Sequence, residues 1–568
     1  MPDKKNFKSI FLLKLPYCSH PDSLGGSDFK AKMTFRPLPS LALASLCAFF
    51  EKYKTNGYSL KALDLNTEAY QNPRVPVDVS VYPDLLVKAI KNNDYDVLAM
   101  SASFVFNVKW VEDAVRLSRE FHPEAKIIIG GGYPTLFPER CLERHDIDDA
   151  IIGEGEATFL HIINRYNNYQ DSEFEKKFPA GPYATKNKKG EISVVAGESH
   201  FIDLADLPLP AWDYLNIDDY FKKSGDDTLP IEGSRGCPYS CSFCSTFMAW
   251  GHRVRYKPAD NLIKEISELK KKYPALKNLL FMDDNLSFSK DIFKDFLTKY
   301  INMDTRLGID FVNFSVKHLD EEIIKLLKQA GLEFLVIAVE TGSPEMQKRI
   351  NKNLNFDKVR EVVKILKSYD FKVGISWMMG FPNETLEQIN QTLNFARELK
   401  AFNNQYFSVL PYPRTRLFKE AKDANLLLFS DDDLDRFDYR QGGYVKSDQW
   451  THEQLKDIIY DINIETNFLN NPYLQTSEKR EFFLKHLEGL LLGLPDHIIS
   501  HLIVGYIYSL KNCRSECEKH YNRAKELFKD QKLAETFTKY LSWDSPVIKD
   551  YNQFISKGLL SEGVKVNL

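Results

Sequence analysis

Residues 232–245 read EGSRGCPYSCSFCS, and three cysteines, Cys237, Cys241 and Cys244, lie within eight positions of each other there. The C-x3-C-x2-C spacing allows three thiolates to bind three irons of a four-iron cluster and leaves the fourth iron without a protein ligand. The alternatives are a structural zinc site and three incidental thiols. Zinc normally takes a fourth Cys or His from a second pair, and the nearest histidine, His252, lies eight residues further on.

Short apolar runs and helical patterns alternate on both sides of this motif, from residue 229 to about residue 424. About six βα units of this kind predict a TIM-type barrel or partial barrel, whose active site lies at the carboxyl ends of the strands. Asp283, Asp284, Glu340 and Thr341 directly follow apolar runs, so we expect them to face the ligand. The expected strands begin at residues 229, 278, 311, 334, 372 and 404 and read LPIEGS, NLLFMDD, FVNFSV, FLVIAVET, KVGISWMMG and NQYFSVLPY.

The region before the barrel, from Phe7 to about Gly155, also alternates apolar runs with amphipathic stretches. Continuous Val/Ile/Leu runs between helices predict a doubly wound, Rossmann-like parallel sheet that is covered on both faces. Ligands bind such sheets outside the carboxyl ends of the strands. The candidate binding residues therefore follow the runs: Ser101, Ser103, Gly130 to Thr135 and Gly153 to Glu156.

After about residue 430 the strand signals end, and the remaining sequence has helical periodicity. Residues 171–190 are charged and poorly periodic, and they precede a proline-containing segment, so we place a boundary near residue 200. The predicted domains are residues 1–200, 201–428 and 429–568. Within the helical region, Cys513, Cys517 and His520 share one helix face, either as incidental side chains or as three soft metal ligands.

The composition of the 568 residues indicates a folded, cytoplasmic protein of about three or four domains. The hydrophobic fraction is 43% and the net charge is -4, so no overall positive field favours nucleic acid. Eight cysteines are too few for a disulfide scaffold, and those outside the two groups above, Cys18, Cys47 and Cys141, are expected to be buried. No signal peptide is predicted, because the first residues have only a short apolar stretch before Lys14 and lack a small-residue cleavage site. No membrane span is predicted, because the longest apolar tract, residues 38–50, is too short.

Further sequence motifs follow one another along the chain, and together with the cysteine loop they resemble one known family. They are SRGCPY (234–239), RYKP (255–258), FMDDNLSF (281–288), AVETGSPE (338–345), MMGFPNET (378–385) and LPYPRTRLFKEA (410–421). From about residue 37 to residue 421 the chain resembles the radical S-adenosylmethionine (SAM) enzymes that carry an amino-terminal cobalamin-binding domain. The resemblance implies a [4Fe–4S] cluster on the three cysteines, with SAM chelating the open iron, and SAM-binding roles for Phe243, Asp283, Glu340, Thr341 and Gly380.

The amino-terminal domain carries its own part of the resemblance. The segments KIIIGGGYPTLFPE (126–139) and AIIGEGEATF (150–159) look like the glycine loops of a cobalamin domain, and FRPLPSLALASL (35–46) resembles the first loop and helix. None of the 12 histidines stands in an Asp-x-His-x-x-Gly pattern, which predicts base-off cobalamin without a histidine on cobalt. The implied cobalamin-binding residues are Ser101, Ser103, Gly131, Gly132, Thr135, Gly153 and Glu154.

The function that this resemblance implies is a cobalamin-dependent radical methyltransferase. A 5′-deoxyadenosyl radical would activate an unreactive carbon of a natural-product, peptide or lipid substrate, and methylcobalamin would supply the methyl group. An electron donor such as flavodoxin or ferredoxin would reduce the cluster. The alternatives are a radical rearrangement, ring contraction or cyclisation without net methylation, and a non-catalytic cobalamin or iron–sulfur sensor. Catalytic residues beyond the cluster ligands, the substrate and the oligomeric state are not assigned.

Overall fold

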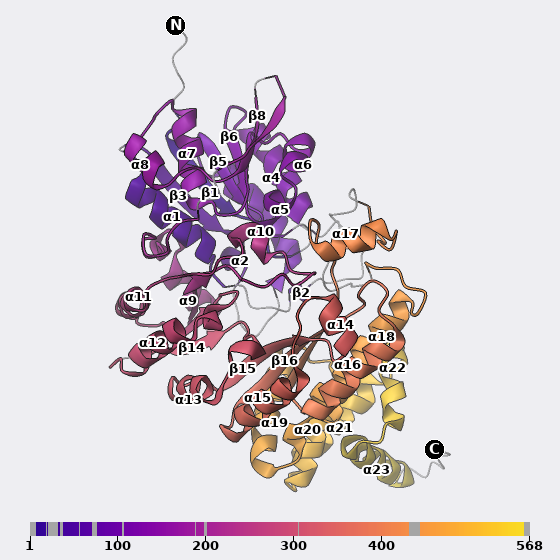
Figure 1. Cartoon of the computed structure of the whole chain (residues 1–568). Coiled ribbons are helices and arrows are strands. Elements are labelled where there is room, and N and C mark those ends of the chain that lie inside the picture. Colours follow the sequence, from indigo (N-terminus) through magenta and orange to yellow (C-terminus); the bar gives the residue numbers. More distant parts are fainter. Residues whose placement is uncertain are drawn as a thin grey trace. The chain divides into compact units, whose positions relative to one another are not determined.

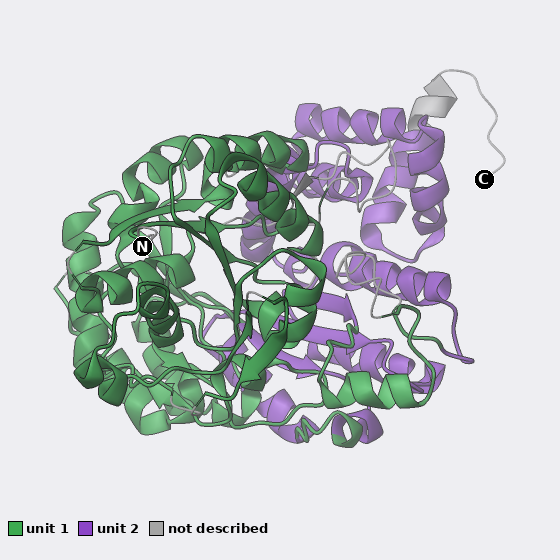
Figure 2. Ribbon diagram, turned by 90° about the horizontal axis from the view of Figure 1, so that it is seen from above, with its two compact units in different colours: residues 1–335, 348–354, 409–446 green, residues 336–347, 355–408, 447–568 purple. Residues whose placement is uncertain are grey.

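The structure is a computed structural model that describes residues 7–18, 20, 32–33, 38–55, 57–70, 77–104, 107–187, 189–197, 201–304, 306–430 and 444–561. The elements are shown along the chain in Figure 1. The chain divides into two compact units, coloured separately in Figure 2. The first unit comprises residues 1–335, 348–354 and 409–446, and the second comprises residues 336–347, 355–408 and 447–568.

The amino-terminal part of the first unit is a seven-stranded sheet in the order β3-β1-β5-β6-β7-β8-β9. The first five strands of this order are parallel, as predicted, and the last two are antiparallel. The strands are β1 (Ser9–Lys14), β3 (Ser59–Asp64), β5 (Val97–Ser101), β6 (Lys126–Gly130), β7 (Asp149–Ile151), β8 (Tyr183–Lys186) and β9 (Ile192–Val195). A separate short pair joins β2 (Lys32–Met33) to β4 (Val77–Asp78).

Helices connect the parallel strands, and their apolar sides supply the core. Ser40 begins α1 by accepting a hydrogen bond from the Leu43 amide at 3.3 Å, and α1 buries Cys47, Phe49 and Phe50 against the sheet core. The helices are α1 (Leu41–Tyr53), α2 (Leu65–Ala69), α3 (Tyr82–Lys91), α4 (Val108–Phe121), α5 (Gly132–Leu136), α6 (Pro138–Arg144), α7 (Glu156–Tyr166) and α8 (Ser172–Lys177).

The β8–β9 hairpin was not predicted. Residues 171–190 have a charged, irregular sequence, and the two strands have only four residues each, too few for a clear alternating pattern. The hairpin forms because β7 offers an edge on which β8 pairs antiparallel, Ala150 opposite Ala184.

The first unit continues with three parallel strands, β10 (Thr228–Ile231), β13 (Asn278–Phe281) and β14 (Gly308–Phe311). The strand expected at residues 311–316 lies earlier, because Gly308 to Phe311 are the residues that pair with β13. A short antiparallel pair, β11 (Ser234–Arg235) and β12 (Arg255–Tyr256), flanks the cysteine loop. The accompanying helices are α9 (Ile217–Ser224), α10 (Thr246–Trp250), α11 (Ala259–Lys272), α12 (Lys290–Ile301), α13 (Glu321–Gln329) and α17 (Arg416–Asp423).

The second unit contains most of another three-stranded sheet, in the order β15-β16-β17, followed by carboxyl-terminal helices. Its elements are β15 (Phe334–Glu340), β16 (Lys372–Met379), β17 (Asn403–Ser408), α14 (Pro344–Arg349), α15 (Phe356–Ser368), α16 (Leu386–Leu399), α18 (His452–Asn463), α19 (Ser477–Gly493), α20 (Ile498–Leu510), α21 (Arg514–Leu527), α22 (Gln531–Phe537) and α23 (Pro546–Ser561). The predicted α/β class with a helical carboxyl-terminal region is therefore confirmed. Among the described residues, no helix is long and apolar enough to cross a bilayer.

Candidate functional site

The cysteine loop leaves β11 and ends at α10, and all three of its thiol-bearing residues are partly exposed. Backbone hydrogen bonds hold the loop on two sides, because the Ser242 amide donates to Ile350 at 2.9 Å and the Ser242 carbonyl accepts from Leu417 at 2.8 Å. In the part of the chain that the structure describes, no three His, Cys, Asp or Glu side chains are placed to hold one metal ion. Three thiolates of one loop can each bind a different iron of a cluster, and they need no common metal ion.

Two aspartates after β13 tie the cysteine loop to the strand ends. Asp283 accepts hydrogen bonds from the Gly233 amide at 3.1 Å and from the Ser234 hydroxyl at 2.6 Å. Burial, followed by the charge of Glu232, raises the pKa of Asp283 to about 7. Asp284 accepts from the Thr246 hydroxyl at 3.1 Å, at the start of α10, and burial raises its pKa as well. Both carboxyl groups therefore brace the loop. Phe243, between the second and third cysteines, is partly exposed.

Three further predicted SAM residues lie in the second unit. Glu340 ends β15 with a φ of 72°, a strained conformation for a residue other than glycine, and such strain is concentrated at functional positions. The Thr341 side chain is fully buried and hydrogen-bonds to Thr392 at 3.0 Å. Gly380 has a φ of 87°, and its amide donates to Glu384 at 2.7 Å. A Cβ at Gly380 would lie 2.6 Å from Leu455, so only glycine fits this turn.

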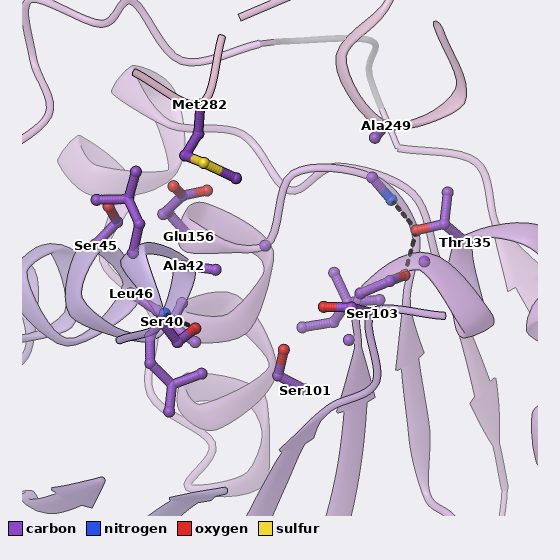
Figure 3. Close-up of a pocket in the computed structure, with 18 of the residues that line it drawn as sticks. Ser40, Ala42, Ser45, Leu46, Ser101, Ser103, Thr135, Glu156, Ala249 and Met282 are labelled. Atoms are coloured by element: carbon purple, nitrogen blue, oxygen red, sulfur yellow. Dashed lines mark hydrogen bonds between the residues drawn. The ribbon is translucent and has the colours of Figure 1, made fainter. Parts of the chain in front are cut away.

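A mostly apolar pocket of about 900 Å³ lies in the first unit (Figure 3). The carboxyl ends of β5, β6 and β7, the start of α1, the exits of β10 and β13, and α10 all contribute to its wall. The predicted cobalamin residues Ser101, Ser103, Gly131, Gly132, Thr135 and Gly153 line it. Glu154 does not, and residues 35–37 of the predicted first loop lie outside the described residues. Glu156, the last residue of the predicted range Gly153 to Glu156, lines it as well, whereas sequence reasoning missed the wall residues Glu232 and Met282.

The glycine loops shape this pocket for a flat ligand. A Cβ on Gly130 would meet no atom within 4 Å, so a side chain there would take up pocket space. Gly131 has a φ of 104°, and a Cβ there would lie 2.5 Å from the Ala102 carbonyl oxygen. The Thr135 hydroxyl donates to the Gly131 carbonyl at 2.7 Å and accepts from the Gly153 amide at 3.0 Å, as Figure 3 shows. These contacts hold the two glycine loops together beside open space, which fits a macrocycle.

A buried ion network joins the second glycine loop to the cysteine loop. Arg235 is 4% exposed, and its guanidinium pairs with Glu154 at 3.0 Å, Glu156 at 2.8 Å and Glu232 at 2.8 Å. Arg255 pairs with Glu154 at 2.6 Å. Burial alone would raise the pKa of Glu156, but the Arg235 guanidinium lowers it. Since Arg235 lies two residues before Cys237, the network fixes the cysteine loop against the turn after β7.

Among the described residues of the helical region, Cys513, Cys517 and His520 form no comparable site. Cys517 is buried on α21, Cys513 precedes that helix, and the His520 ring hydrogen-bonds to His501 at 2.9 Å. Burial, followed by the charge of His501, lowers the pKa of His520 to about 4. The His520 ring is thus engaged with another histidine of the helical region.

Comparisons with protein-family models match residues 231–396 to the radical SAM superfamily and residues 36–163 to the B12 binding domain. The chain is a radical SAM protein with a B12-binding domain. The three-cysteine loop therefore belongs to the radical SAM domain, and the sheet edge with the glycine loops belongs to the B12-binding domain.

Known proteins similar to this radical SAM protein cover most of its length. A cytidylyl-2-hydroxyethylphosphonate methyltransferase of Streptomyces wedmorensis is 25% identical over 82% of this chain and 91% of its own. An anaerobic magnesium-protoporphyrin IX monomethyl ester cyclase of Rubrivivax gelatinosus is 23% identical over 67% of this chain and 68% of its own. The solved structure of OxsB, a cobalamin-dependent SAM radical enzyme with aqua-cobalamin and SAM bound, shares the fold with a TM-score of 0.63 and 15% identity, over 96% of this chain and 84% of that one.

The cofactors of this radical SAM protein are a [4Fe–4S] cluster, SAM and cobalamin. The residues present fit them, because the loop offers three thiols and the pocket offers open glycine backbone beside an apolar wall. The base-off state of cobalamin, without a protein histidine on cobalt, remains a prediction.

Proposed function

We propose that this protein is a cobalamin-dependent methyltransferase that methylates an unactivated carbon of a small-molecule or peptide substrate. The observation that carries the proposal is the single pocket, whose wall combines glycine loops of the B12-binding domain with Glu232, Trp250 and Met282 of the radical SAM domain. When bound, the reduced cluster and SAM supply a radical that removes a hydrogen atom, and cobalamin supplies the methyl group.

We assign binding roles to the residues as follows. Cys237, Cys241 and Cys244 hold the cluster, and Phe243, Asp283, Glu340, Thr341 and Gly380 bind SAM or support its site. Ser101, Ser103, Gly131, Gly132, Thr135, Gly153 and Glu154 form or support the cobalamin site, with Glu154 acting through Arg235 and Arg255. We retain residues 1–200, 201–428 and 429–568 as the proposed domains.

The remaining wall residues keep water away from the reacting groups. Leu12, Leu41, Ile128, Phe159 and Leu280 line the pocket with side chains that neither donate nor accept hydrogen bonds. An apolar wall protects a reactive intermediate from side reactions with solvent. We also propose an electron donor such as flavodoxin or ferredoxin as partner, and the cytoplasm as the location.

A cyclisation or rearrangement without net methylation is the second candidate, because a cyclase is among the similar proteins. The phosphonate methyltransferase matches a larger share of this chain, 82% against 67%, and we therefore prefer methylation.

The experiment that separates the two is product analysis with the reconstituted, reduced full chain. Methylation predicts S-adenosylhomocysteine and 5′-deoxyadenosine together, and a product heavier than the substrate by one CH2 group. 5′-Deoxyadenosine alone, with a product of unchanged carbon count, would overturn methylation in favour of the second candidate. The Cys244→Ala variant, which removes one cluster thiolate, is the matched control and should form neither compound.

A further inference from the structure

The cysteine loop has an exposed side that the roles assigned above do not use. Ser240, between the first two cysteines, is exposed, and its carbonyl accepts a hydrogen bond from the Asn351 side chain at 3.0 Å. The Ser242 amide donates to the Ile350 carbonyl at 2.9 Å. Residues 349–352 therefore lie against the loop, and a second protein that reaches this edge comes close to the cluster ligands.

Lys317 is an exposed cation at one end of this segment. Its ammonium group donates a hydrogen bond to the Lys352 carbonyl at 2.7 Å and lies 4.6 Å from the centre of the Tyr239 ring, which belongs to the cysteine loop. A cation–π contact of this kind positions an ammonium group without neutralising its charge. Among the described residues, no carboxylate forms an ion pair with Lys317. Lys317 therefore holds a positive charge over the cysteine loop.

Arg416 places a second positive charge at the other end of the same segment. It is the first residue of α17, and its guanidinium donates to the Arg349 carbonyl at 2.5 Å. The side chain is half exposed and pairs with Glu420, one turn further along the helix, at 3.1 Å. The start of α17 is fixed to the cysteine loop, because the Leu417 amide donates to the Ser242 carbonyl at 2.8 Å. Two exposed cations therefore flank the segment that lies against the loop.

Positive charge predominates around the cysteine loop. The four segments joined by these contacts all belong to the first unit: residues 237–246, 312–319, 348–354 and 409–419. They contain seven Lys and Arg residues and no Asp or Glu, whereas the whole chain has a net charge of -4. Five of the seven are exposed: Lys317, Lys348, Arg414, Arg416 and Lys419. The carboxylates that follow on α17, Glu420 and Asp423, pair with Arg416 and Lys419 of the same helix. Such a local excess of one sign attracts a partner of the opposite charge.

We propose that this basic surface, defined by Lys317, Lys348 and Arg416, is the docking site of an acidic one-electron carrier protein. The inference rests on the proposed function, which requires reduction of the cluster. One electron leaves the reduced carrier and enters the oxidised cluster, so the carrier is oxidised by one electron, and no bond forms or breaks. The rate of electron transfer falls steeply with distance. A position beside the cluster ligands therefore favours an electron carrier over other polyanions, which gain nothing from this proximity.

The test measures binding of a purified acidic flavodoxin to the full chain with its reconstituted cluster, by titration calorimetry at low and at high salt. The double variant Lys317→Gln/Arg416→Gln should bind flavodoxin about 5- to 20-fold more weakly than the wild type at low salt, because two exposed charges are lost. The difference should shrink at high salt, which screens exposed charges. The matched control, Lys264→Gln/Lys271→Gln, removes two exposed charges from α11 and should bind like the wild type.

A chemical reductant separates docking from the state of the cluster. Dithionite is a small molecule that needs no protein docking site, so it should produce the same electron paramagnetic resonance signal of the reduced cluster in the wild type and in both double variants. Reduction by flavodoxin hydroquinone, followed by the same signal, should be slower only in Lys317→Gln/Arg416→Gln.

Equal flavodoxin affinity and equal reduction rate in the wild type and Lys317→Gln/Arg416→Gln would overturn the proposal. So would a DNA oligonucleotide that binds this surface more tightly than flavodoxin does. If the double variant does not hold its cluster, Lys348→Glu tests the same surface, and it should weaken flavodoxin binding by about 3- to 10-fold. Because docking and reduction are measured without substrate, a protein that passes both tests but forms no methylated product would contradict only the proposed methylation.

Discussion

Lys14 and Arg235 are both buried in the first unit of this protein, and their surroundings are opposite. Arg235 contacts three carboxylates, and its pKa is raised because these charges outweigh the effect of burial. Its guanidinium also lies 4.7 Å from the Trp250 ring centre. Lys14 contacts two hydroxyl groups and an aromatic ring, and burial lowers its pKa to about 8.

The difference separates a cation that is held by carboxylates from one that is held by hydroxyl groups and an aromatic ring. The charge of Arg235 is compensated within the protein, and its partners come from the turn after β7 and from the exit of β10. Among the described residues no carboxylate forms an ion pair with Lys14, so folding bears the cost of burying its charge. Functional sites commonly retain such locally unfavourable groups.

The largest expected effect comes from removing the Arg235 guanidinium, whose charge is compensated by carboxylates. Arg235→Met would remove the main partner of three carboxylates, two of them with side chains at most 8% exposed, and we expect the free energy of unfolding to fall by about 3–5 kcal/mol. Urea unfolding of the full chain, followed by tryptophan fluorescence, measures the loss. Arg235→Lys should lose less, because it keeps the charge but not the forked geometry. Equal stability of wild type and Arg235→Met would contradict a structural role.

A smaller effect concerns the uncompensated cation and depends on pH. Since the pKa of Lys14 is lowered from 10.5 to about 8 in the folded state, the unfolded chain binds more protons between these values. The free energy of unfolding therefore rises as the pH increases from about 8 to 10.5. This gain in stability is lost again as the pH falls through about 8.

The wild type should therefore gain about 2 kcal/mol relative to Lys14→Met between about pH 7 and pH 9.5. Urea unfolding of both proteins, freed of cobalamin, at several pH values gives this difference directly. If the difference in unfolding free energy between the two proteins does not change over this pH range, the pKa of Lys14 is not lowered in the folded protein.

The smallest expected effect concerns Glu232, one of the three carboxylates of the ion network. Two guanidinium groups face three carboxylates there, and Glu232, at 16% side-chain exposure, is the most exposed of the three. Glu232→Gln removes the excess negative charge and leaves two charges of each sign. We expect a change of less than about 1 kcal/mol in the same unfolding experiment. A loss as large as that of Arg235→Met would place Glu232 at the centre of the network.

Much of the fold could be predicted from the sequence, because the local periodicity of apolar residues indicates helices and strands. The apolar runs between Phe7 and about Gly155 predicted a parallel sheet, and β1, β5 and β6 form adjacent parallel strands of it. The β8–β9 hairpin and the position of β14 were not foreseen, because both depend on the strand against which they pair. The pocket was predicted in part, through the serines and glycines that follow the strands.

The sequence by itself determined the cysteine loop, because Cys237, Cys241 and Cys244 are neighbours along the chain and their spacing already specifies three ligands. Only the tertiary structure decided the partners of the two buried cations. Lys14 meets Ser101 and Ser103 across 87 and 89 residues, and Arg235 meets Glu154 and Glu156 across 81 and 79 residues. Contacts over such separations form only when the sheet and the strand exits pack, and no local pattern encodes them.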